Sequence, residues 1–147
     1  MVLMGYFLKA FLFKDENHPK VLFGDLVPRV IKLKQGISMV PILKDLEDQI
    51  GNSEKVNGFG TLSNKLEECA LKISNGGLLA YVEAEFFGGL GSQSALAWEN
   101  GERCFGPVHV DSAINQILKI FKVEVEKATD EFEAVGLGKH RKTEDWV

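Results

Sequence analysis

The sequence predicts an α+β fold: a single domain with a largely antiparallel sheet, packed with about four to five helices. Alternating side chains across residues 78–107 predict a three-stranded meander, and Asn100–Gly101 is a strong hairpin-turn signal between its last two strands. Residues 30–40 alternate in the same way around Gln35–Gly36 and predict a second hairpin. Because hairpins dominate over strand–helix–strand units, the strands are expected to pair antiparallel.

Length and composition fit this class. A chain of 147 residues is long enough to bury one proper core. The hydrophobic content of 45% and the charged content of 26% are typical of a soluble globular protein. A net charge of -4 disfavours a nucleic-acid partner, because nucleic-acid-binding domains usually carry a basic surplus. We therefore expect one domain over residues 1–147.

The N-terminal stretch is expected to form a central strand. Residues 5–13 are apolar on both faces of an extended chain, and only Lys9 interrupts them. The stretch lacks the basic start and the cleavage site of a secretion signal, and it is too short to cross a bilayer. We therefore expect a cytoplasmic protein with no membrane association. Residues 19–27 predict a short helix that ends at Pro28.

Two helices are predicted between the hairpin and the meander. The first begins at Pro41 and ends at Gly51, a residue type that favours a helix C-terminus. The second has the clearest helical spacing in the chain, over residues 62–73. Either Thr61 or Ser63 can cap its first turn.

The meander and two further helices complete the expected elements. The three strands of the meander are expected at residues 79–87, 92–98 and 103–105. Gly106–Pro107 should end the third strand. Asp111 is expected to cap the next helix. The buried face of that helix is predicted to be Ala113, Ile114, Ile117, Leu118 and Phe121. Residues 130–134 predict a last short helix, ended at Gly136 or Gly138.

Two acidic side chains on the first strand of the meander are candidates for function. At alternate positions of a strand, Glu83 and Glu85 lie on one face about 6.5–7 Å apart. Such a pair can separate its pKa values for acid–base chemistry or bind a hard cation. The other interpretation is a solvated or salt-bridged sheet face, although Tyr81 and Phe87 indicate partial cover. A metal site with His140 has suitable ligand types, but this spacing is not diagnostic.

The C-terminal residues 139–147 combine the most basic run of the chain with Trp146. A large aromatic side chain stabilises a protein by packing, so we expect this tail to fold back and bury Trp146. Arg141 or His140 would then lie near the two carboxylates, because unpaired buried charge is costly. The resulting candidate cluster for function or tail docking is Glu83, Glu85, Gln93, His140, Arg141 and Trp146.

No standard catalytic or cofactor signature occurs in the sequence. The motifs of P-loop, zinc-protease, serine-hydrolase and dithiol sites are absent. Glycines between residues 88 and 91 lead into a strand rather than a helix, so they predict a plain turn. Cys69 and Cys104 are expected to be buried free thiols in a reducing compartment. We therefore predict no cofactor.

Two segments carry a resemblance to a known group of proteins. They are EAEFFGGLGSQ at residues 83–93 and GLGKHRKTEDW at residues 136–146. With these segments the chain resembles a group of short bacterial hypothetical proteins over nearly its whole length. The resemblance implies a bacterial, cytoplasmic protein with one compact domain, and it implies no activity, cofactor or partner.

The function expected from these observations is a non-catalytic protein-binding domain, either immunity-like or accessory. The immunity-like interpretation rests on size and α+β build, which is an analogy of fold only. One alternative is a small enzyme or metal-dependent hydrolase that uses Glu83, Glu85 and His140. Another is a structural homo-oligomer, such as a homodimer. A concave pocket lined by both glutamates favours the enzyme, whereas a flat or apolar exposed patch favours the binding domain.

Overall fold

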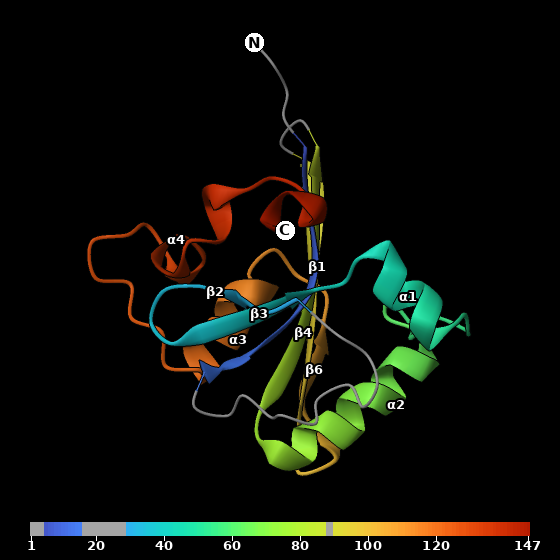
Figure 1. Ribbon diagram of the computed structural model, residues 1–147. Helices are drawn as coiled ribbons and strands as arrows, with labels where there is room; N and C mark the ends of the chain where they lie inside the picture. The colour runs from blue at the N-terminus through green and yellow to red at the C-terminus, as the bar shows by residue number, and fades with distance from the viewer. Residues whose placement is uncertain (1–4, 16–28, 88–89) are drawn as a thin grey trace.

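The computed structural model describes residues 5–15, 29–87 and 90–147. Figure 1 traces the chain through a central sheet with helices on both sides. The helix predicted at residues 19–27, with its end at Pro28, lies outside the described residues.

Six strands form one antiparallel sheet, as the hairpin signals predicted. They are β1 (Tyr6–Lys14), β2 (Ile31–Lys32), β3 (Ile37–Pro41), β4 (Leu79–Phe87), β5 (Leu90–Glu99) and β6 (Glu102–Val108). Their order across the sheet is β2-β3-β1-β4-β5-β6, and every neighbouring pair is antiparallel. Positive φ angles at Gln35–Gly36 and Asn100–Gly101 close the two predicted hairpins. The strand expected to be central, β1, lies between β3 and β4.

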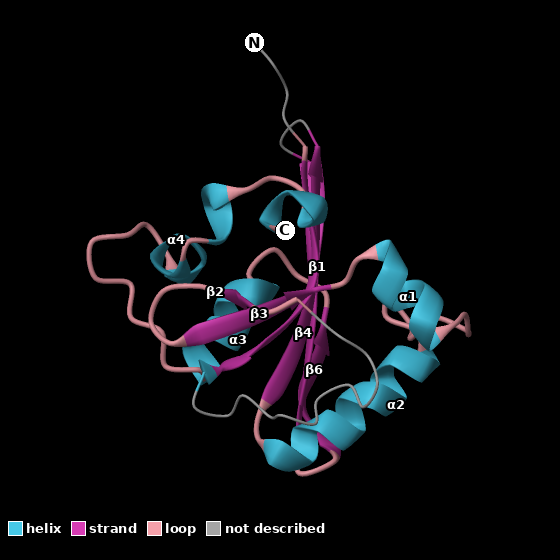
Figure 2. Cartoon of the chain, viewed as in Figure 1, coloured by secondary structure: helices cyan, strands magenta, loops and turns pink. Residues whose placement is uncertain are grey.

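Helices cover both faces of this sheet and make a three-layer arrangement (Figure 2). The α-helices are α1 (Lys44–Ile50), α2 (Asn64–Ile73), α3 (Ala113–Ile120) and α4 (Glu131–Val135). The 3₁₀ turns are η2 (Ser74–Gly76), η3 (Leu137–Lys139) and η4 (Thr143–Trp146). The α1 and α2 helices lie on one face, and α3, α4 and the C-terminal turns lie on the other. The fold is therefore α+β in one sheet-centred unit. Among the described residues, no helix is long and apolar enough to span a membrane.

Each face of the sheet has its own hydrophobic core because most of β1 and β4 is buried on both sides. On the α1/α2 face, Phe11, Tyr81 and Trp98 pack against apolar side chains of α2. On the α3/α4 face, Leu8 and Val82 are among the strand residues that pack against the predicted stripe of α3. Alternation along each strand sends successive side chains into different cores.

Local boundaries differ from the sequence prediction at several places. The strand β5 begins at Leu90 rather than at residue 92, so Gly91 of the expected turn lies in a strand, and β2 spans only Ile31–Lys32. Three further differences involve prolines or a helix cap. Pro41 is the last residue of β3, paired with Ala10, so α1 begins only at Lys44. The N-cap of α3 is Ser112 rather than Asp111. Where sequence signals do match, Ser63 caps α2 by accepting the N–H of Leu66.

A further difference is that β6 continues across Gly106–Pro107 to Val108. Ala95 pairs with Val108 and Ala97 pairs with Phe105, so β6 has one more residue than β5 between these pairs. A bulge of this kind accommodates a proline inside a strand. Gly106 has a φ of +83°, which favours glycine.

Candidate functional site

The two predicted carboxylates lie on the α1/α2 face of the sheet, in two neighbouring rows of paired residues. The inner row, nearer the hydrophobic core, is Lys9, Glu83 and Ser94, and the outer row is Phe7, Glu85 and Ser92. Directly paired residues of adjacent strands point to the same face. The two rows differ in how many hydrogen bonds and ion pairs their side chains already make within the protein.

Glu83 is held by four hydrogen bonds from the protein itself. Its Oε1 accepts the N–H groups of Thr61 and Leu62, at 2.6 and 2.9 Å, and the hydroxyl of Tyr81 at 2.8 Å. Its Oε2 accepts the N–H of Gly60 at 2.8 Å. Burial, reinforced by the charge of Glu83, raises the pKa of Tyr81 well above its ordinary value, so this hydroxyl keeps the proton that it donates. Glu83 therefore anchors the loop before α2 to the sheet.

Because Glu83 and Lys9 of the inner row already bind other groups of the protein, they have little capacity left to bind a ligand or to transfer a proton. An ionised carboxylate offers about four lone-pair sites, two on each oxygen, and Glu83 already binds three donors at Oε1 and one at Oε2. Opposite Glu83, the ammonium of Lys9 binds Glu47 on α1, with Nζ and Oε1 2.5 Å apart. The inner row thus ties the sheet to the loop before α2 and to α1, which is an architectural role.

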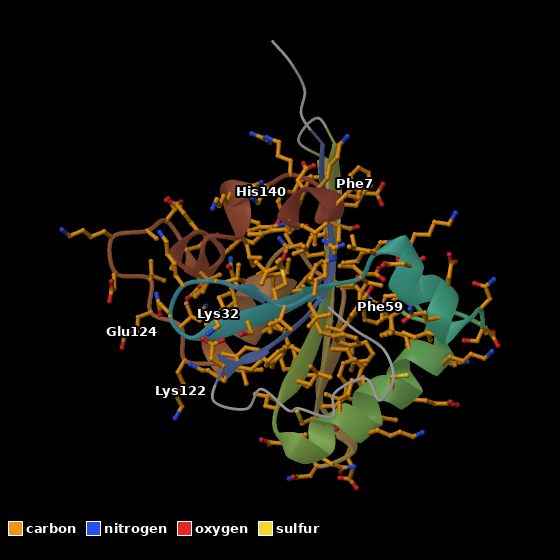
Figure 3. The ribbon with its side chains drawn as sticks, viewed as in Figure 1. Phe7, Lys32, Phe59, Lys122, Glu124 and His140 are labelled. Carbon is orange, nitrogen blue, oxygen red and sulfur yellow. The ribbon has the colours of Figure 1, made fainter. Side chains whose placement is uncertain are left out.

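The outer row is open to solvent. Phe7 is 44% exposed although it is a large apolar side chain, and Glu85 and Ser92 are also exposed. The row lines a cleft of about 570 Å³, which we call the Phe7 cleft. Its walls include Thr61 from the anchored loop and residues 142–144 from the C-terminal tail. Figure 3 shows Phe7 pointing away from the sheet on the side that carries α1.

The C-terminal tail lies along an uncovered part of β1. The β3 strand pairs with β1 only from Ala10 onward, and the N–H of Ile42 still binds the carbonyl of Lys9 at 2.8 Å, which leaves the backbone of Phe7 and the N–H of Lys9 open on that side. There the carbonyl of Arg141 accepts the N–H of Phe7 at 2.7 Å. The hydroxyl of Thr143 accepts the N–H of residue 9 and donates to the carbonyl of Phe7, both at 3.3 Å. The tail therefore covers the edge of β1 and forms one wall of the cleft.

The other predicted residues of the tail lie on the opposite face. Trp146 is only 9% exposed and packs in the core on the α3/α4 side. The ring of His140 contacts it edge-on, with centroids 4.7 Å apart, and Figure 3 shows His140 across the sheet from Phe7. Gln93 also faces this side, where its Oε1 caps α3 by accepting the N–H of Ile114 at 2.9 Å.

The six residues of the predicted cluster are therefore divided between the two faces of the sheet. Glu83 and Glu85 lie on one face, and Gln93 and Trp146 lie on the other. The hydrogen bonds of Glu83 come from the loop before α2 and from β4, so the tail does not supply them. Arg141 lines a second cleft of about 410 Å³ together with Gln93. Alternation separates Gln93 from the glutamates, because it pairs with Ala84 on β4.

The predicted metal ligands are not assembled in the described part of the chain. No three side chains of the His, Cys, Asp and Glu types gather there in a way that could hold an ion. His140 packs on Trp146 across the sheet from both glutamates. The donor set of Glu83, Glu85 and His140 therefore does not fit a metal.

One polar pair beside the cleft has no signal in the sequence. His109 Nδ1 lies 2.7 Å from the hydroxyl of Ser94, which is 7% exposed and lines the cleft. A serine next to a histidine is a nucleophile–base arrangement when a third group orients the imidazole. Here the histidine ring packs on Phe59, with centroids 5.0 Å apart, and a Cβ at Gly58 would lie 2.4 Å from Nε2. The ring of His109 therefore packs on the loop at Gly58 and Phe59. The bulge between β5 and β6 places His109 beside Ser94 of β5.

No protein-family model, curated protein or solved structure matches this chain. The function is therefore argued from the geometry of the cleft alone.

Proposed function

We propose that this protein is a non-catalytic protein-binding domain, immunity-like or accessory, and that it binds its partner through the Phe7 cleft. The observation that carries the proposal is Phe7 itself, a 44% exposed aromatic side chain whose chain neighbours Tyr6 and Leu8 are buried on the other face of the sheet. Exposed apolar side chains in a concave, partly polar surface are typical of interaction sites.

The support of the cleft agrees with a binding role. The strand that carries Phe7 is paired on one side with β4, and on the other side it is covered by the tail. The loop that forms the opposite wall is anchored by Glu83. A surface held in this way loses little conformational entropy when a partner binds, which favours affinity.

Site-specific photo-crosslinking tests this proposal. A photoreactive amino acid at Ser92 should crosslink one protein in source cells, and the same amino acid at Glu124, on the far side of the fold, should not (Figure 3). Phe7→Ser should remove the crosslink while the melting temperature stays close to that of the unchanged protein. Equal crosslinking from both positions, or a crosslink that survives Phe7→Ser, would contradict the proposal. A crosslink to a second copy of the chain would support the homo-oligomer instead.

A small hydrolase is a second candidate, favoured by one observation. The Phe7 cleft is concave and is lined by both Glu83 and Glu85. His140, the third residue of the predicted enzyme site, lies across the sheet. The side chains that remain for catalysis in this candidate are Glu85 and the Ser94–His109 pair. A panel of ester, phosphoester and glycoside substrates tests it. Turnover that Glu85→Gln or His109→Ala abolishes would replace the binding proposal.

A further inference from the structure

We infer that the partner segment that enters the Phe7 cleft presents an arginine side chain, which lies on the ring of Phe7 and binds the carboxylate of Glu85. This inference rests on the proposed function and names the chemistry of the partner. It follows from the geometry of the outer row, from the charges around it and from the shape of the guanidinium group.

The outer row places an aromatic ring directly beside a free carboxylate. Phe7 and Glu85 are paired across β1 and β4, so their Cβ atoms are about 4.5–5.5 Å apart on one face. On the other side of Glu85, the paired residue is Ser92, whose hydroxyl adds an acceptor. The three exposed side chains thus form one continuous strip across three strands.

The charges around the cleft leave Glu85 without a cation. Within the described residues, the ion pairs are Lys9 with Glu47 and Arg103 with Glu67, so Glu85 takes part in neither. The other charged side chains of the cleft are Glu83, which already accepts hydrogen bonds from backbone N–H groups and from Tyr81, and Lys142 and Glu144, which lie two residues apart on the tail. Acidic side chains of the cleft therefore outnumber basic ones, and Glu85 is the exposed carboxylate of the strip, in a chain whose net charge is -4. A basic partner is complementary to it.

Arginine fits this strip better than lysine for a geometric reason. A guanidinium is planar, so it can stack on an aromatic ring while its N–H groups point sideways to a carboxylate. The ammonium of lysine is a compact point charge and cannot present both a flat face and a fork of donors. Along the Phe7–Glu85–Ser92 strip, an aromatic ring face is followed by a carboxylate and then by a hydroxyl. The flat face of a guanidinium can stack on the ring, and its N–H groups can donate to the two oxygen-bearing side chains.

Titrations followed by amide chemical shifts test the inference directly. The probes are N-acetyl-arginine methylamide and its citrulline analogue, which has nearly the same shape without the charge. Arginine should shift the amide signals of Phe7, Glu85 and Ser92 at millimolar concentration, and citrulline should not. Equal shifts with both probes, shifts spread over the whole acidic surface, or no shifts at all would each overturn the inference.

Matched variants assign the contact to its residues. Glu85→Gln should weaken arginine binding by up to about fivefold, the upper end of the range for an exposed ion pair. Phe7→Leu keeps an apolar side chain but removes the ring face, so it should also weaken binding. Glu102→Gln removes an exposed charge on β6, outside the cleft, and should leave binding unchanged. An equal loss in the Glu102 variant would overturn the inference. A partner that crosslinks at Ser92 while arginine fails to bind would leave the proposed function intact and refute only this inference.

Discussion

Replacing Glu83 with glutamine tests whether this side chain is architectural. The carboxylate accepts three backbone N–H groups from residues 60–62 and the hydroxyl of Tyr81. Glutamine has the same shape, but one of its terminal atoms is an N–H₂ group, which donates and cannot accept. At least one of the four donors then loses its acceptor and faces another donor.

The expected loss follows from the burial of these donors. The N–H of Gly60 is exposed and can bind water, so it contributes little to the loss. The hydrogen bonds from the N–H groups of Thr61 and Leu62 and from the hydroxyl of the fully buried Tyr81 are part-buried, so water replaces them less readily. At about 1 kcal/mol for each weakened bond to a charged acceptor, Glu83→Gln should lower the free energy of unfolding by about 3 kcal/mol. For a domain of this size, that corresponds to a decrease in melting temperature of roughly 6–12 °C.

Urea unfolding followed by tryptophan fluorescence measures this difference, since Trp98 is buried in the same core. The matched control is Glu85→Gln on the same strand and face, whose carboxylate is exposed and should change stability by less than about 0.5 kcal/mol. Similar effects of the two substitutions, or a Glu83 variant as stable as the unchanged protein, would refute the reasoning. Faster proteolysis within residues 58–62 should accompany the loss, because that loop is no longer anchored.

Two further predictions concern other parts of the fold. Arg103 binds the carboxylate of Glu67 and holds its pKa below the ordinary value of 4.5, so this contact stabilises the protein above that pH and is lost as the pH falls through the lowered pKa. Glu67→Gln should therefore cost about 1 kcal/mol at pH 7 in urea unfolding, and the difference should shrink below pH 4.5; a pH-independent difference would contradict this assignment. Trp146→Ala should cost about 3 kcal/mol because it empties a buried site, and deletion of residues 139–147 should cost more. Val147→Ala, at a 49% exposed position, is the control, and a truncated protein with an unchanged melting temperature would contradict the packing role of the tail.

The parts of the fold that could be predicted are those governed by local rules. Alternation of side chains indicated the strands of the meander, and Asn100–Gly101 and Gln35–Gly36 marked the turns, because few residue types adopt positive φ there. Spacing along residues 113–121 correctly predicted the buried stripe of α3. The error at Pro41 arose where pairing with the distant strand β1 overrode the local preference of proline, and the error at Gly106–Pro107 arose where a bulge let β6 continue along β5.

The candidate site was only partly predictable for the same reason. Alternation alone indicated that Glu83 and Glu85 share a face, and Phe7 was simply one more apolar residue of a strand read as buried on both sides. The exposure of Phe7 depends on how far α1 extends over the sheet, and no local sequence pattern indicates that. The Ser94–His109 contact likewise depends on the bulge between β5 and β6.

The sequence by itself determined the class of the fold, the hairpins, and the apolar faces of the helices, because turn chemistry and side-chain periodicity act over a few residues. Only the tertiary structure decided what each polar group does. It joins Glu83 to backbone donors 21 to 23 residues away, and it joins Lys9 to Thr143 across 134 residues. Such contacts depend on register, on the sheet face and on the path of the tail. These are set by burying two cores at once, and no short stretch of the sequence encodes them.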